Sequence, residues 1–208
     1  MIKFLILSTI LLIGCNHQKQ LKPLKSNKKE TITHSKLEEF IPENYVILDS
    51  VSGNINLDEY NDIILILKVK NEDSIANESS DFILRPLLIL CKDRNNKYNL
   101  ITRNDSLVLC FNCGGIFGDP YAGTEINNGK IKINHYGGSN DRWTNNLTFK
   151  FNRKDKSIYL YEIEEASYNL MNITDENEDI DKYIESNTKR KTQKDFGKIK
   201  IEDYSNEF

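Results

Sequence analysis

The segment with the clearest potential for chemistry is a run of oxygen-bearing side chains between Gly53 and the strand-like segment that begins at Ile63. Side-chain oxygens recur there at alternate positions, and a backbone carbonyl falls into the same spacing. A single loop with this spacing can wrap a hard cation such as Ca²⁺ with oxygen ligands. We therefore predict a weak calcium loop made by Asn54, Asn56, Asp58, Tyr60 and Asp62. The alternative is a metal-free turn whose Asn and Asp side chains bond their own backbone.

The same run resembles the calcium loops of FG-GAP or VCBS-type β-propeller blades, which read Asp-x-Asp/Asn-x-Asp-Gly-x-x-Asp before a strand. The resemblance covers the loop and the segment through about Tyr98, roughly one blade. Asn54 replaces an acidic ligand, and Glu59 replaces the glycine that permits the tight bend. An EF-hand is excluded, because Leu65 stands where that loop requires a bidentate glutamate. With fewer carboxylates, the resemblance implies calcium binding of low affinity.

The C-x-x-C pair at Cys110 and Cys113 is the second candidate site. A redox C-x-x-C opens a helix whose N-terminus lowers the thiol pKa, but here two glycines follow at once and oppose a helix. A structural disulfide between the two, or a pair of buried thiols, is the leading interpretation. A zinc site made by Cys91, Cys110, Cys113 and His135 remains the alternative.

The third candidate site is Arg142 and Trp143, which end the second of two glycine-rich segments. Gly114–Tyr121 reads GG-x-FGDP-aromatic, and His135–Trp143 reads aromatic-GGS…RW. Both resemble segments of uncharacterised bacterial lipoproteins, a resemblance that implies no established reaction. In the functional interpretation, Arg142 binds a carboxylate or phosphate and the Trp143 indole stacks on a sugar or peptide. In the alternative, Trp143 fills the edge of the core and Arg142 bonds loop carbonyls.

The N-terminus predicts where the chain resides. Lys3 precedes the apolar stretch Phe4–Ile13, which is too short for a spanning helix. Leu12–Cys15 resembles the lipobox of bacterial lipoproteins, which implies cleavage before Cys15 and attachment of lipid, palmitate included, to its sulfur. We expect a lipid-anchored protein of the bacterial cell envelope. Because Asn16 and the next residues are not acidic, we place it on the outer membrane, facing the periplasm.

The elements that must position these residues are mainly strands. Uninterrupted apolar runs predict central strands covered on both faces, at 63–67, 87–90 and 107–109, and Tyr45–Leu48 is a further candidate. Later segments alternate apolar and polar residues, and Asn128-Gly129 predicts a hairpin between two of them. We predict a mainly β fold with an antiparallel sheet, sandwich or partial-propeller-like, and one or two short helices. The expected short helix runs from Ser35 to Ile41, and a last strand holds Ile199 and Ile201. Residues 71–81 and 174–194 are expected to be polar excursions, the second with one or two amphipathic turns.

The predicted organisation is a signal peptide at 1–14, a tether at 15–34 and a single β-rich domain at 35–208. The net charge of −3, without a concentrated basic face, argues against a nucleic-acid partner. His135 is the only histidine inside the predicted domain and has no recognisable nucleophile elbow nearby. The sequence therefore predicts a non-catalytic, membrane-tethered lipoprotein that binds another envelope component, protein or polymer, through its glycine-rich loops. A periplasmic carboxylate-dependent hydrolase and an inhibitor or immunity lipoprotein are the alternatives.

Overall fold

The computed structural model describes residues 37–78, 83–172 and 180–206, all within one unit that spans Thr33–Phe208. The predicted signal peptide (1–14), the predicted lipidation site at Cys15 and the predicted tether (15–34) lie outside the described residues. Within the described ranges, no helix combines the length and the apolar character that crossing a membrane requires.

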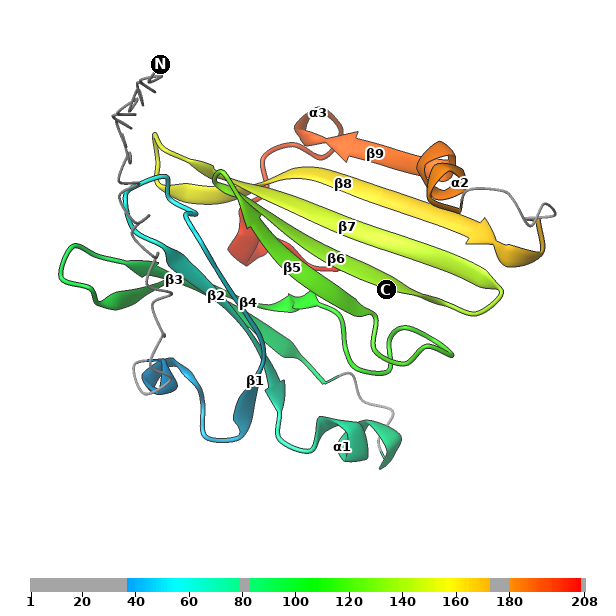
Figure 1. Cartoon of the computed structure of the whole chain (residues 1–208), viewed down its shortest axis with the longest axis horizontal. Coiled ribbons are helices and arrows are strands. Elements are labelled where there is room, and N and C mark those ends of the chain that lie inside the picture. Colours follow the sequence, from blue (N-terminus) through cyan, green and yellow to red (C-terminus); the bar gives the residue numbers. More distant parts are fainter. Residues whose placement is uncertain (1–36, 79–82, 173–179, 207–208) are drawn as a thin grey trace, which may run out of the picture. The chain divides into compact units, whose positions relative to one another are not determined.

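The first sheet is a four-stranded antiparallel meander in sequence order (Figure 1). Its two central strands carry the apolar runs, and the first six residues of each are buried whichever face they point to. This confirms the prediction of central strands covered on both faces for the runs at 63–67 and 87–90. The prediction was wrong for the run at 107–109, which ends an edge strand of this sheet. The strands are β1 (Tyr45–Gly53), β2 (Asp62–Val69), β3 (Arg85–Lys92) and β4 (Tyr98–Val108).

The second sheet has five antiparallel strands, also in sequence order. Its first hairpin turns at Asn128 and Gly129, whose φ angles of 49° and 72° are those that a two-residue turn requires. The predicted hairpin is therefore confirmed. The strands are β5 (Tyr121–Asn127), β6 (Lys130–Gly138), β7 (Asp141–Asn152), β8 (Ser157–Asn169) and β9 (Thr188–Thr192).

The two sheets form two layers that share one hydrophobic core (Figure 1). Ile64, Ile66 and Ile89 contribute from the first sheet, and Ile133 and Phe149 from the second. The predicted mainly β, antiparallel fold is thus confirmed, with two sheets packed on a common core as in a sandwich.

Helices are more numerous in the described residues than the one or two expected. The segment predicted as a loop after Asn71 begins with a helix, whose acidic first turn complements the helix dipole. The expected helix before Pro42 is a single 3₁₀ turn, and its predicted cap at Ser35 lies outside the described residues. The α-helices are α1 (Glu72–Glu78), α2 (Ile180–Asn187) and α3 (Gln193–Phe196), and the 3₁₀ helices are η2 (Glu38–Phe40), η3 (Leu170–Asn172) and η4 (Ile201–Asp203).

Two predictions for the C-terminal region were wrong. The basic run Lys189–Lys191 is exposed but does not belong to an irregular excursion, because it lies in the edge strand β9, which pairs with β8 where acidic residues face it. Arg190 Nε lies 3.0 Å from Glu164 Oε1, and Lys191 Nζ lies 2.9 Å from Glu165 Oε2. The expected strand at Ile199 and Ile201 is reduced to one bridge at Lys200, after which Ile201 enters η4 with its side chain in the core.

Candidate binding site

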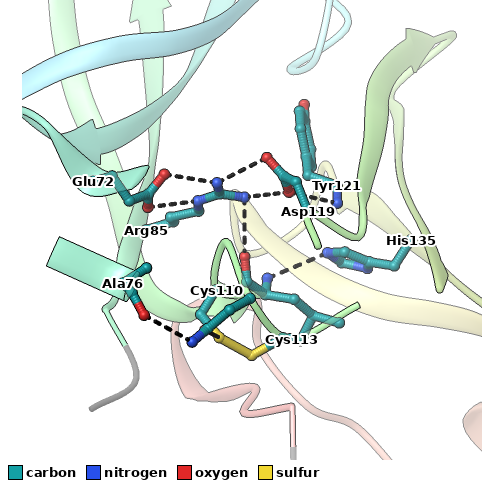
Figure 2. The surroundings of a disulfide bond; sticks show 10 residues. Glu72, Ala76, Arg85, Cys110, Cys113, Asp119, Tyr121 and His135 are labelled. Carbon is teal, nitrogen blue, oxygen red and sulfur yellow. Dashed lines mark hydrogen bonds and ion pairs between the residues drawn. A yellow bond between two sulfur atoms is a disulfide. The ribbon is translucent and has the colours of Figure 1, made fainter. Parts of the chain in front are cut away.

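A buried guanidinium joins the first sheet to the segment between β4 and β5. Arg85, the first residue of β3, is fully buried (0% exposed). Its Nε and Nη2 donate to both Glu72 oxygens at 2.8 and 2.7 Å, and its Nη1 and Nη2 donate to both Asp119 oxygens at 2.6 and 2.8 Å (Figure 2). Burial alone would lower the pKa of Arg85, but the bonds to Glu72 and Asp119 outweigh it and raise that pKa above its usual value. The arginine is therefore permanently charged and held by two forked ion pairs.

We name residues 109–119, between β4 and β5, the glycine loop. Arg85 holds both of its ends. Its Nη1 lies 3.3 Å from the carbonyl oxygen of Leu109, where the loop begins. Asp119, where the loop ends, receives the two bonds described above. One side chain on a central strand thus holds both ends of the glycine loop.

His135, on β6 of the second sheet, also holds the start of the glycine loop at Leu109. The Leu109 N–H donates to Nε2 of His135 at 3.4 Å, which leaves the ring proton on Nδ1 (Figure 2). Burial lowers the pKa of His135 to about 4, although the Asn145 backbone and Asp119 partly oppose this shift. The only histidine of the described body is therefore neutral at neutral pH, with one nitrogen engaged in holding the loop.

A disulfide closes the first half of the glycine loop. Cys110 and Cys113 are joined at an S–S distance of 1.99 Å, and the side chain of Asn112 donates to the Ala76 carbonyl of α1 at 3.5 Å. Cys91 remains a free thiol on β3, where burial and the neighbouring Asp62 raise its pKa. The zinc alternative is wrong for this arrangement, because two of its four ligands are consumed by the disulfide.

Backbone hydrogen bonds close the second half of the loop. Gly114 N–H donates to Gly118 O at 2.7 Å, and Gly118 N–H donates to Gly115 O at 3.0 Å. The loop is also tied to the end of β6, where Gly138 N–H donates to Gly114 O at 2.9 Å. A Cβ on Gly114 would lie 2.5 Å from Gly118 O, so this approach of the two backbone segments requires glycine.

The tip of this fixed loop exposes apolar side chains. Ile116 is 83% exposed and Phe117 is 47% exposed. The Arg142 guanidinium carbon lies 3.7 Å from the centre of the Phe117 ring and 5.8 Å from that of Tyr136, which is a cation–π arrangement. Arg142 Nε and Nη1 are buried without a hydrogen bond to any residue in the described part of the chain. Arg142 therefore positions Phe117 by stacking, and these two nitrogens do not bond loop carbonyls as the alternative expected.

Arg142 and Trp143 do not form one platform. They are consecutive residues of β7 and therefore point to opposite faces of the sheet. Arg142 lies with Tyr136 on the outer face, whereas Trp143 lies beside Gly137 on the face that carries the core. A Cβ on Gly137 would lie 2.5 Å from the Trp143 ring, so the indole can occupy this position only because residue 137 has no side chain.

The predicted calcium loop is closed by its own hydrogen bonds. Asp62 is fully buried, and its carboxylate accepts the N–H groups of Ile55 at 2.9 Å, Asn56 at 3.2 Å and Lys92 at 3.1 Å. Asn54 Nδ2 donates to the Asp58 carbonyl, and the Tyr60 N–H donates to the Asp58 side chain at 2.7 Å. This geometry is that of the metal-free alternative. No three His, Cys, Asp or Glu side chains group as metal ligands in the residues described, and calcium binding here stays a prediction.

The comparisons with known proteins leave the function to be argued from this geometry. No protein-family model matches the chain, and neither a curated protein nor a solved structure is significantly similar to it. Sequence reasoning missed the Arg85, Glu72 and Asp119 cluster. Its only visible signal was a lone arginine directly before a buried apolar run.

Proposed function

We propose that this protein is a non-catalytic, lipid-anchored envelope protein that binds another envelope protein through the tip of the glycine loop. The observation that carries the proposal is the exposure of Ile116 and Phe117 on a loop whose backbone is fixed at both ends and in between. Exposed apolar side chains are common in mobile loops. A loop that is already fixed, in contrast, loses little conformational entropy when a partner covers its side chains.

The chemistry of the tip favours a protein partner. An isoleucine and a phenylalanine offer apolar area without hydrogen-bonding groups, which suits insertion into an apolar pocket. Met171, 76% exposed, follows β8 at the same end of the sheet, where Leu170 N–H bonds the Asn140 carbonyl at 2.9 Å. The three side chains can form the centre of a small interface, with polar residues around them.

The predicted anchor sets where such a partner must be found. Lipid on Cys15 and a tether of residues 15–34 would hold the domain near one membrane. Even fully extended, that tether reaches about 70 Å, since a chain spans at most about 3.5 Å per residue. We therefore expect the partner to be embedded in, or attached to, the same envelope layer.

Site-specific photo-crosslinking in the native cell tests this proposal. A photoreactive amino acid replaces Ile116 in the full-length chain, and the matched control carries it at Ile101, a 50% exposed isoleucine on β4. We expect one defined protein adduct from position 116 that is absent from position 101. Adducts that are the same at both positions, or none at position 116, would overturn the proposal.

A further inference from the structure

We infer that the face of the second sheet opposite Arg142 holds a separate binding site for a saccharide. A hollow of about 520 Å³ lies there at the ends of β7, β8 and β9, within the range of small-molecule sites. The side chains that line it and are used below are Trp143, Asn145, Glu165, Ser167 and Lys189.

Strand register explains why these side chains converge. Trp143 pairs with Ser167, Asn145 pairs with Glu165, and Glu165 pairs with Lys189 on the next strand. Directly paired residues of antiparallel strands point to the same face, and so do alternate residues of one strand. Three neighbouring strands therefore place the five side chains on one contiguous patch of this face.

Trp143 provides a flat apolar wall that is already fixed. Its ring lies directly over Gly137, where any Cβ would collide with it, and the residue remains partly exposed. The indole thus needs no reordering to accept a ligand. A pyranose ring offers the matching surface, because its axial C–H groups form an apolar face while its hydroxyls project from the rim.

The rest of the lining suits those hydroxyls. Asn145 lines the hollow, and its Oδ1 is a buried acceptor without a hydrogen-bond partner in the described residues. Ser167 adds a hydroxyl, and Glu165 adds an acceptor that is also paired with Lys191 at 2.9 Å. Glu165 and Lys189 add one acceptor and one donor to the lining. Together with the Ser167 hydroxyl and the Asn145 amide, these groups suit a ligand whose hydroxyls both donate and accept hydrogen bonds.

The only tryptophan of the chain makes the test direct, because all indole emission comes from this site. Cellotetraose and chitotetraose are titrated into the purified protein while Trp143 fluorescence is followed. We expect a saturable change in emission with at least one of them at millimolar concentration or below. Glu165→Gln should weaken that binding about fivefold, the effect of losing one hydrogen bond to a charged acceptor.

Glu162→Gln is the matched control, because it makes the same change on β8 but on the opposite face of the sheet. It should leave the affinity for the sugars unchanged. Ile116→Ser in the glycine loop should leave it unchanged too, and this result distinguishes the saccharide site from the proposed protein interface. If Glu165→Gln lowers the melting temperature markedly, Ser167→Ala replaces it in the same assay. No emission change with either sugar, or an equal loss from Glu162→Gln and Glu165→Gln, would overturn the inference.

Discussion

Arg85 is the residue on which the geometry of the glycine loop depends. Its charge lies fully inside the protein, where an unpaired guanidinium would be very costly, and four bonds to Glu72 and Asp119 compensate for the lost water. Glu72 is as buried as Arg85, whereas the Asp119 side chain is 32% exposed. The two carboxylates should therefore differ in their importance for stability.

We expect Glu72→Gln to lower the free energy of unfolding by about 3 kcal/mol, since removing one partner leaves a buried charge uncompensated. Asp119→Asn should cost clearly less, because water can replace part of the lost interaction at that side. Urea denaturation of both variants measures the difference. Equal losses would mean that burial does not rank the two carboxylates.

His135 makes the stability depend on pH. Its folded pKa of about 4 lies below the ordinary value of 6.5, so below pH 6.5 the unfolded chain binds a proton that the folded chain does not. Stability from this residue is complete above pH 6.5 and is lost as the pH falls toward 4. The full loss is about 3 kcal/mol, from 1.36 kcal/mol per unit of pKa difference.

Urea unfolding at pH 7 and pH 4.5 checks this prediction, with His135→Gln as the comparison. The glutamine amide oxygen can still accept the Leu109 N–H but does not titrate. The variant should lose much less stability than the natural chain over this interval. The same loss in both proteins would assign the effect to other groups.

At the scale of elements, the glycine loop packs against the β6–β7 turn through close backbone contacts. Some glycines of these contacts have no room for a side chain. Gly118 and Gly138 both have positive φ, 70° and 112°. A Cβ on Gly118 would meet no atom within 4 Å, whereas one on Gly138 would lie 2.0 Å from the Asp141 carbonyl oxygen. Only the second position combines backbone strain with a collision.

Gly118→Ala should therefore lower the free energy of unfolding by about 1 kcal/mol, the cost of a left-handed conformation for alanine. Gly138→Ala should cost about 3 kcal/mol or more, because the β6–β7 turn must be rebuilt. Thermal or urea unfolding of the two variants measures this order. A Gly138→Ala protein as stable as Gly118→Ala would contradict the described turn.

Elements with a local pattern could be predicted from the sequence, and those that depend on distant partners could not. The runs at 63–67 and 87–90 and the Asn128-Gly129 turn carry their own signals, and β2, β3 and the β5–β6 hairpin follow them. Strand β9 has no apolar alternation, and its pairing rests on the acidic residues of β8 about 26 positions away. The Arg85 cluster likewise joins residues 13 and 34 positions apart, a closeness that only the folded sheets create.

The candidate site was predicted in part. The sequence predicts binding through the glycine-rich loops, and the structure folds the first of these segments into the loop that exposes Ile116 and Phe117. The assignment of Arg142 and Trp143 to one platform was wrong, because adjacent strand residues point to opposite faces. Recognition of β7 as a strand that already includes residue 142 would have revealed this.

At the scale of the whole molecule, two surfaces of different chemistry lie on the two faces of one sheet. The apolar tip backed by Arg142 belongs to the outer face, and the polar hollow beside Trp143 belongs to the face that carries the core. A module with this arrangement could contact a protein and a saccharide at once. Such a role fits the lipid anchor that we propose at Cys15.

Replacement of Cys15 tests that anchor. We expect the natural chain to be recovered with the membrane fraction, and its N-terminal peptide to begin at Cys15 with the added mass of its acyl chains. Cys15→Ser should remove this mass, because the serine has no sulfur to which the lipid can be attached. Cell fractionation and mass spectrometry give the answer. An unmodified Cys15 in the natural chain would contradict the lipoprotein assignment.

Hydrogen exchange of the glycine loop in the free protein tests the central claim most directly, namely that a fixed backbone presents Ile116 and Phe117. We predict that the amides of Gly114, Gly118 and Gly138, which donate hydrogen bonds within the loop and to it, exchange as slowly as those in the interior of β6. Exchange of all three at the rate of an unstructured peptide would contradict the account, because the exposed side chains would then belong to a loose loop and not to a preorganised binding surface.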